Sequence, residues 1–177
     1  MGQKVNPIGL RLALNKNWSS HWFARKDNKN NFGDWLHEDL KIRSYIKKNF
    51  NNAAISKILV ERYGTRVRVT IYAARPGILI GRKGAELDAL KASVSKLLAQ
   101  GEELILDVVE IKQPETNAQL VAESVAQQLE RRIGFRRAMK KAIQVAMELG
   151  AEGIKIHWAG RLGGAELART EQYKEGR

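Results

Sequence analysis

The stretch GILIGRKGAELDAL, residues 77–90, decides the fold of the chain around it. A short apolar turn leads into a G-x-x-G loop at 81–84, and a helix with an apolar stripe follows the loop. Glycines at the two ends of the loop let another backbone come close, because no Cβ stands in the way. Arg82 and Lys83 add two cations, and the start of the following helix favours phosphate. The pattern predicts a loop that holds a nucleic-acid backbone, and a plain turn is the alternative.

The segments on either side of this loop predict a sheet covered by helices. Residues 33–49 have the period of an amphipathic helix, and residues 54–62 and 66–73 form two strands joined by a turn. A helix at 85–99 and a strand apolar on both faces at 103–111 follow. The order helix, strand, strand, short helix, G-x-x-G, helix, strand is that of a type II KH domain, whose loop clamps single-stranded nucleic acid. We therefore expect a three-stranded sheet with its helices on one face.

A second region begins after Pro114, where we place the boundary between two domains. Helices are expected at 117–133 and 135–149, and a strand at 153–159. The glycine-rich end, residues 160–177, predicts a loop with at most one short helix. The fold class is therefore α+β, in three parts. These are a basic N-terminal arm at 1–16, a type II KH domain at 17–113 and a smaller α+β domain at 114–177.

Charge predicts a polyanionic partner. The 177 residues include 31 Lys and Arg against 19 Asp and Glu, a net charge of +12. The net charge is +10 in residues 1–75, −2 in 76–115 and +4 in 116–177, which suggests two binding surfaces on a neutral core. The chain has no cysteine and no apolar run long enough for a membrane span or a secretory signal. We expect a cytoplasmic protein that does not bind membranes.

The segment RRIGFRRAMKK, residues 131–141, is the second strong signal, with six basic residues and no acidic one. On a helix, Arg136, Arg137, Lys140 and Lys141 fall within an arc of about 140°, and an apolar stripe lies opposite. Such a helix docks on its own domain and presents cations to a polyanion. A membrane surface is the weaker alternative, because the apolar stripe is rich in Ala and Met.

The first thirty residues are polar and show no helical or strand period. Trp18, Trp22 and Phe23 interrupt them, close to Arg25 and Lys26. The aromatic rings could stack on bases or could pin the arm to its own domain, and the sequence leaves both alternatives open.

The sequence lacks the motifs of several classes of enzyme. The three histidines are far apart and lack partners at metal-ligand spacing, and neither a G-x-x-x-x-G-K-[ST] phosphate loop nor a G-x-S-x-G nucleophile elbow is present. We expect no catalytic residue, no metal site and no cofactor.

Four blocks make the chain recognisable: MGQKVNPIGLRL, ARPGILIGRKG, QLERRIGFRRAMKKAIQVAMELGAEGIK and GRLGGAELARTE. They resemble the family of bacterial small-subunit ribosomal protein S three. The blocks fall in order from residue 1 to residue 171, so the resemblance covers nearly the whole chain. Each block alone is weak evidence, but the four together are highly specific.

The resemblance implies a structural RNA-binding component of the head of the small ribosomal subunit. Its partners would be small-subunit ribosomal RNA and messenger RNA, with ribosomal proteins S ten and S fourteen as neighbours. It also implies a place at the channel through which messenger RNA enters, beside S four and S five. There, by motif match, Arg136, Arg137 and Lys140 would grip and unwind incoming messenger.

Three groups of residues are expected to contact RNA. The KH loop group is Arg75, Gly81, Arg82, Lys83 and Gly84. The group in and before the basic helix is Arg131, Arg132, Arg136, Arg137, Lys140 and Lys141. The group in the arm and the C-terminal loop is Gln3, Lys4, Asn6, Arg11, Trp22, Arg161 and Arg169.

Two expectations go with the resemblance. Family members continue past residue 177 with further strands, so the second domain would be truncated and the strand at 153–159 would lack partners. A longer mature protein, or RNA or a neighbouring protein over that edge, would resolve this. A free KH protein that regulates transcripts is the alternative function, although charge spread over two regions favours the ribosome.

Overall fold

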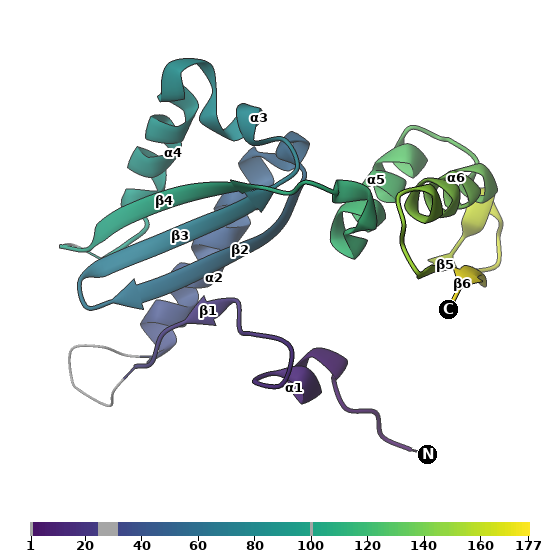
Figure 1. Cartoon of the computed structure of the whole chain (residues 1–177), viewed down its shortest axis with the longest axis horizontal. Helices are drawn as coiled ribbons and strands as arrows, with labels where there is room; N and C mark the ends of the chain where they lie inside the picture. The colour runs from purple at the N-terminus through teal and green to yellow at the C-terminus, as the bar shows by residue number, and fades with distance from the viewer. Residues whose placement is uncertain (1, 25–31, 100) are drawn as a thin grey trace. The chain divides into compact units, whose positions relative to one another are not determined.

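Two compact units make up the chain in the computed structural model, which describes residues 2–24, 32–99 and 101–177. The first unit runs from Met1 to Glu110 and the second from Ile111 to Arg177. Both units combine helices with strands (Figure 1), which confirms the α+β class. No helix in the described ranges is long and apolar enough to cross a membrane.

A mixed sheet forms the centre of the first unit. Its strands are β1 (Ser20–His21), β2 (Ile55–Tyr63), β3 (Arg66–Ala73) and β4 (Glu103–Glu110), in that spatial order. β2 and β3 pair antiparallel, and the turn between them uses Gly64 at a φ of 61°. β4 lies parallel to β3, and β1 lies parallel to β2. The three expected strands are present, and the two-residue β1 extends the sheet at one edge.

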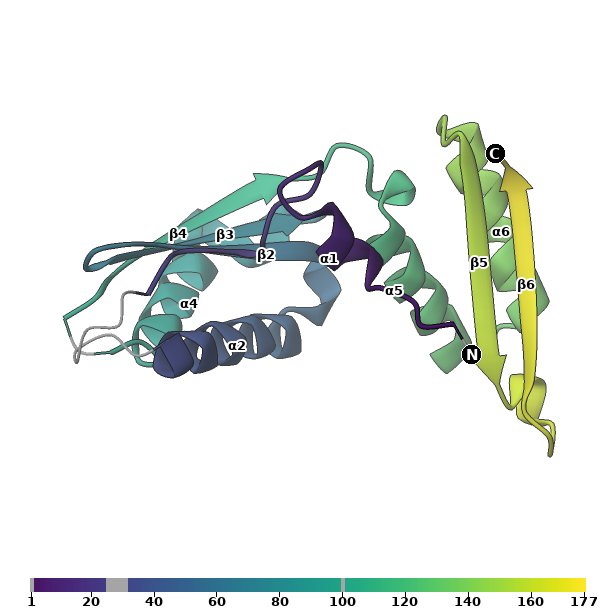
Figure 2. The same cartoon turned by 90° about the horizontal axis from the view of Figure 1, so that it is seen from below.

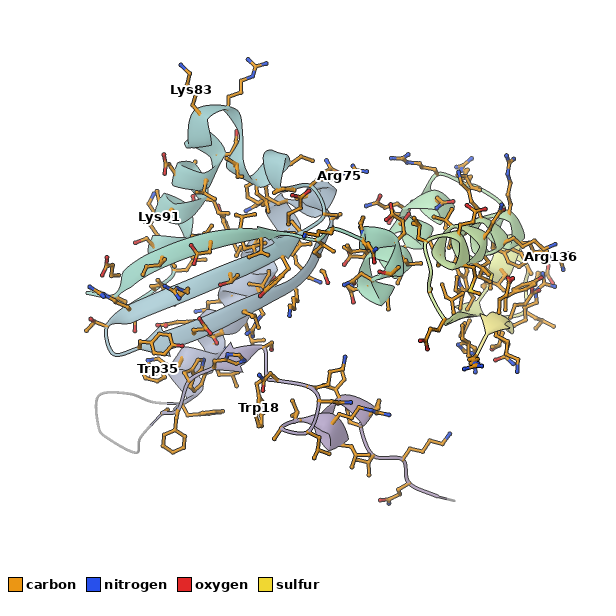
Figure 3. All side chains as sticks on the ribbon, viewed as in Figure 1. Trp18, Trp35, Arg75, Lys83, Lys91 and Arg136 are labelled. Atoms are coloured by element: carbon orange, nitrogen blue, oxygen red, sulfur yellow. The ribbon has the colours of Figure 1, made fainter. Side chains whose placement is uncertain are left out.

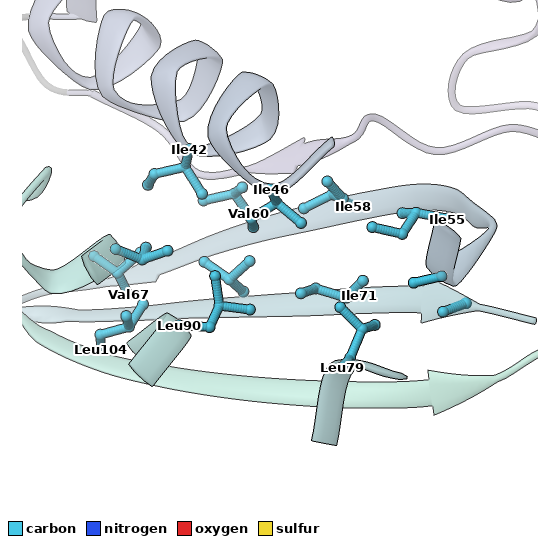
Figure 4. Packing of buried hydrophobic residues seen from close by; sticks show 14 of the residues in the cluster. Ile42, Ile46, Ile55, Ile58, Val60, Val67, Ile71, Leu79, Leu90 and Leu104 are labelled. Carbon is cyan, nitrogen blue, oxygen red and sulfur yellow. The ribbon is translucent and has the colours of Figure 1, made fainter. Parts of the chain in front are cut away.

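Helices cover one face of this sheet, as expected (Figure 2). The two long ones are α2 (Phe32–Asn49) and α4 (Ala85–Ser95). Ile42 and Ile46, one turn apart on α2, pack on Val60 and Ile71 of the sheet, and Leu90 of α4 joins them in a buried core (Figure 4). The short elements of this unit are α1 (Pro7–Arg11), η1 (Asn51–Ala53), α3 (Pro76–Ile80) and η2 (Arg82–Gly84).

The opposite face of the sheet is polar. Arg66 of β3 pairs with Glu103 of β4 at 2.9 Å, and Arg68 pairs with Asp107 at 3.5 Å. Apolar residues on both faces of 103–111 are typical of a central or covered strand, but the structure contradicts both features, and Ile105 and Val109 lie on the open face. β4 is an edge strand, and the side chain of Asp107 is 50% exposed, because the helices of the described unit pack on the other face.

Arg62, near the end of β2, is a buried cation with a side chain only 1% exposed. Its guanidinium donates to Glu38 at 2.8 Å and Asp39 at 3.0 Å on α2, and to Glu102 at 3.2 Å just before β4. It also lies 5.2 Å from the centre of the Trp35 ring. Burial raises the pKa of Glu102 above its ordinary value of 4.5, and the charge of Arg62 offsets part of this effect.

Asp39 also fastens the N-terminal arm to α2. Its Oδ2 accepts hydrogen bonds from the Ser20 hydroxyl at 2.7 Å and from the Trp22 indole N–H at 2.8 Å. Arg43, one turn further along α2, donates to the carbonyl of Ser19 at 2.8 Å. These bonds and the strand pairing hold β1 beside β2, so Asp39 and Arg43 together join this segment to the core of the unit.

The second unit places two helices against a two-stranded sheet. Its elements are η3 (Pro114–Thr116), α5 (Ala118–Glu130), α6 (Phe135–Glu148), β5 (Gly153–Gly160), η4 (Leu162–Gly164) and β6 (Arg169–Gly176). Asn117 caps α5 by accepting from the backbone N–H of Gln119 and Leu120. Val125 of α5 and Met139, Ile143 and Ala146 of α6 are buried in this unit.

The prediction of a loop over residues 160–177 is wrong, because Arg169–Gly176 is a strand. β6 pairs antiparallel with the whole of β5, from Gly153 opposite Gly176 to Gly160 opposite Arg169. The expectation that the strand at 153–159 lacks a partner is therefore also wrong. A two-stranded ribbon becomes stable when it packs on a helix, and α6 supplies that surface here.

We expect Asp39→Ala to lower the free energy of unfolding by about 3 kcal/mol, the low end of the cost of breaking a buried ion pair. The low end applies because Glu38 and Glu102 remain beside Arg62. Urea unfolding followed by circular dichroism measures the loss.

The matched control is Asp34→Ala, an exposed carboxylate in the first turn of the same helix. Its loss should stay below about 1 kcal/mol, the value of one charge at a helix end. Equal losses in the two variants would show that the buried network contributes nothing special.

Candidate nucleic-acid interface

The G-x-x-G loop connects α3 to α4 and has an unusual backbone conformation. The N–H of Gly81 closes α3 by donating to the carbonyl of Gly77 at 2.9 Å. Three of the four loop residues then have positive φ, namely Gly81 at 69°, Lys83 at 55° and Gly84 at 85°. A Cβ on Gly81 would overlap the side chain of Glu86, so glycine is required there both for its φ and for space.

The cations of the loop are free to bind a ligand. The side chains of Arg82 and Lys83 are exposed, and Figure 3 shows Lys83 pointing away from the sheet at the tip of the loop. Arg75, at the start of α3, is exposed as well. In the described ranges, no carboxylate lies within 4.0 Å of any of these three. The first turn of α4 carries Glu86 and Asp88, which offset the helix dipole, so the loop cations supply most of the positive potential.

Two apolar side chains beside the loop were missed by the sequence analysis as functional candidates. Ile78 and Ile80 of α3 are 42% and 40% exposed. The sequence of residues 77–80 predicts only a short apolar turn, and apolar residues in such a turn are ordinarily expected to be buried. Exposed apolar groups next to unpaired cations suit a nucleotide, which has an apolar base face and a charged phosphate.

The basic helix has the two faces that its sequence predicts. Ala138, Met139, Ile143 and Ala146 of α6 are buried, whereas Arg136, Arg137, Lys140 and Lys141 are exposed. Among the described residues, Arg137, Lys140 and Lys141 have no carboxylate within 4.0 Å. Three unpaired cations along one helix face form a surface for a polyanion.

Arg136 differs from its neighbours because β6 supplies it with a partner. Glu171 of β6 lies 3.9 Å from Arg136 and 3.3 Å from Arg169, and its own side chain is only 20% exposed. Both guanidinium groups also lie over the ring of Phe135, at 5.6 and 5.7 Å. Glu171 therefore offsets part of the positive charge of Arg136 at the start of α6.

The other basic residues predicted in this unit lie outside the helix. Arg131 caps the end of α5, and Arg132 follows it in a left-handed conformation with φ of 61°, so neither belongs to α6. Arg161 lies before η4 and donates to the carbonyl of Ala165 at 2.9 Å. Arg169 was assigned to a C-terminal loop, but it is the first residue of β6.

The N-terminal arm is ordered by local bonds and remains exposed. Asn6 accepts from the N–H groups of Ile8 and Gly9 and so begins α1, and Arg11 donates to the carbonyl of Pro7. Gln3 and Lys4 are exposed. Exposed apolar side chains accompany them, namely Val5, Ile8, Leu10 and Leu14, each at least 62% exposed. Such a surface is typical of a segment that is covered by a partner.

Of the two alternatives for the aromatic residues of the arm, Trp22 pins the arm to its own domain. Its indole N–H donates to Asp39, and its ring packs edge-on against Trp35 with 5.3 Å between the ring centres. Trp18 and Phe23 are 52% and 84% exposed and stay available to a partner. Arg25 and Lys26 lie outside the described residues. Within those residues no group of three or more His, Cys, Asp or Glu side chains could hold a metal ion.

We expect Gly81→Ala to lower the free energy of unfolding by about 1–3 kcal/mol, because alanine is strained at this φ and its Cβ meets Glu86. Gly77→Ala in α3 is the matched control, since a Cβ there has nothing within 4 Å. It should be neutral or stabilising by up to about 1 kcal/mol. Equal effects in urea unfolding would contradict the assigned loop geometry.

Comparison with known proteins identifies both units. A family model described as KH domain matches residues 41–116. A second model, described as Ribosomal protein S3, C-terminal domain, matches residues 125–177. The first match contains the G-x-x-G loop, and the second contains the basic helix and β6.

Relatives match along the full length of the chain. Small ribosomal subunit protein uS3 of Caulobacter vibrioides is 58% identical over 177 residues, which are 100% of this chain and 69% of that protein. The proteins of the same name from Beijerinckia indica subsp. indica and Akkermansia muciniphila are 56% and 54% identical, and the chain covers 71% and 76% of them. These names denote a ribosomal protein and not an enzyme, as the sequence predicts. Identity of this extent, with both family models matched in order, shows that the chain belongs to the family of small ribosomal subunit protein uS3.

Proposed function

We propose that this chain is a structural RNA-binding component of the head of the small ribosomal subunit, and that its second unit grips messenger RNA where the messenger enters the ribosome. The names of the relatives support a place in the small ribosomal subunit, and the KH family match supports RNA binding. The single observation that carries the second part is the exposed face of α6, where Arg137, Lys140 and Lys141 have no acidic partner in the described unit.

In this proposal the two units bind different kinds of RNA. The KH loop and the arm bind ribosomal RNA, through Arg75, Arg82 and Lys83 and through the exposed residues of α1. These contacts hold the protein in place. The face of α6 contacts phosphates of the incoming messenger, and a row of fixed cations competes with base pairing for the single strand. Ribosomal proteins S four and S five would stand beside α6 at the channel, and S ten and S fourteen beside the protein in the head.

A free KH regulator of transcripts remains the alternative class. It would need a single RNA-binding groove, whereas this chain carries unpaired cations on both units. Membership of a ribosomal family also favours the ribosome.

We expect Arg82→Asp with Lys83→Asp to weaken binding of small-subunit ribosomal RNA by at least about tenfold at low salt, because two attractions to phosphate become repulsions. Filter binding measures the affinity, and sucrose gradients measure the fraction of the protein in the small subunit. The control is Lys41→Asp with Lys48→Asp, which makes the same charge change on exposed positions of α2. An equal effect of both pairs would mean that net charge acts without a specific loop site.

We expect Arg137→Ala with Lys140→Ala to leave subunit assembly intact but to slow translation of messages with stable hairpins. Two fewer phosphate contacts should also reduce the slope of log affinity against log salt by about 1.4 for single-stranded RNA. Translation of hairpin-bearing and unstructured messages in a reconstituted system gives the comparison.

The control for this pair is Lys155→Ala with Lys174→Ala, two exposed cations that face each other across β5 and β6. It removes the same charge from the same unit, from the two strands and not from α6. Normal translation through hairpins by the α6 variant would rule out the proposed role of this helix.

A further inference from the structure

The basic face of α6 forms one wall of a shallow groove, and an aromatic ring contributes to the other wall. The groove is lined by Arg136, Arg137, Lys140, Lys141, Gln144 and Tyr173. Five of these residues come from α6, and Tyr173 comes from β6. The sequence does not point to Tyr173, because the pattern of residues 160–177 predicts a loop and not the strand that is present.

The pairing of the two strands fixes the side on which Tyr173 lies. Tyr173 is opposite Ile156 of β5, on the same face as the half-buried Trp158. A second hollow joins Tyr173 to Ile143 and Met147 of α6. Tyr173 is therefore half-buried and lines both hollows, one beside apolar residues of the helix and one beside its basic residues.

The cations of this groove do not distinguish single-stranded from double-stranded RNA, because both carry phosphates. An aromatic ring does distinguish them. A single strand can turn a base onto the ring, whereas a duplex keeps its bases stacked and paired. An aromatic group beside four cations is thus the combination that proteins use to hold single-stranded nucleic acid.

We infer that Tyr173 is a stacking platform for a base of single-stranded RNA whose phosphates lie along Arg137, Lys140 and Lys141. The inference rests on the proposed function of α6 and adds the group that selects an unpaired strand. It also explains why β6 matters to the groove: the strand supplies both Tyr173 and Glu171, the carboxylate that lies 3.9 Å from Arg136.

Binding of two probes tests the inference. One is a short oligouridylate, and the other is an abasic ribose–phosphate strand of the same length, which has phosphates but no bases. Tyr173→Leu should weaken binding of the oligouridylate roughly tenfold, at the low end of one base–aromatic stack, and leave the abasic strand unaffected. Tyr173→Phe keeps the ring and should bind both probes as the wild type does. Measurement in the Arg82→Asp, Lys83→Asp background removes binding at the KH loop.

The outcomes separate this inference from the function on which it rests. If Arg137→Ala with Lys140→Ala changes binding of neither probe, the proposed function of α6 fails. If that pair weakens both probes but Tyr173→Leu acts on both equally or on neither, the stacking role is overturned. An equal effect on both probes is what damage to the fold would produce. A polyglutamate peptide that binds as tightly as the oligouridylate would also overturn the inference, since the groove would then accept an acidic protein.

Discussion

The buried guanidinium of Arg62 is the constraint on which the first unit depends. A guanidinium stays charged in any protein environment and donates in fixed directions, so acceptors must stand close to it once water is excluded. The two terminal nitrogens of Arg62 have such acceptors, whereas its Nε is buried without a partner in the described residues. Here the acceptors come from α2 and from the residue that precedes β4. The same Asp39 carboxylate then reaches the arm through Ser20 and Trp22. Helix α2, the sheet and the arm therefore have to be in place together. The positive charge of the buried Arg62 is balanced by the three carboxylates around it.

Basic side chains in this chain differ in whether they have acidic partners. Arg62 inside the first unit is surrounded by carboxylates, and Arg66 and Arg68 on the open sheet face are paired across strands. The G-x-x-G loop and α6 each carry cations without an acidic partner in the described residues, as do other exposed lysines such as Lys41 and Lys155. Phosphate therefore meets free positive charge where the backbone geometry is also suited to it, on a glycine-framed loop and along a helix face.

Much of this arrangement could be predicted from the sequence. The alternation of Val67, Val69 and Ile71 gave β3, and the cations of 136–141 gave the basic face of α6. The missed strand β6 has Glu171, Tyr173 and Glu175 on the face where a strand usually carries apolar residues, so no apolar alternation identifies it. The burial of Asp39 was equally hidden, because its partner Arg62 is 23 residues away and nothing near Asp39 distinguishes it from a surface carboxylate. Periodicity detects a face, but it does not detect a bond between distant polar groups.

The position of β6 in the chain has a consequence for biosynthesis. Domains fold in order as the chain leaves the ribosome, N-terminal parts first. The cations of α6 emerge well before residues 169–176, so the helix is exposed to cellular RNA while Glu171 and Tyr173 are still absent. During that interval the nascent chain has a basic helix without the strand that supplies Glu171 and Tyr173 to the groove. With the inferred role of Tyr173, the groove would select unpaired strands only after residues 169–176 have been made.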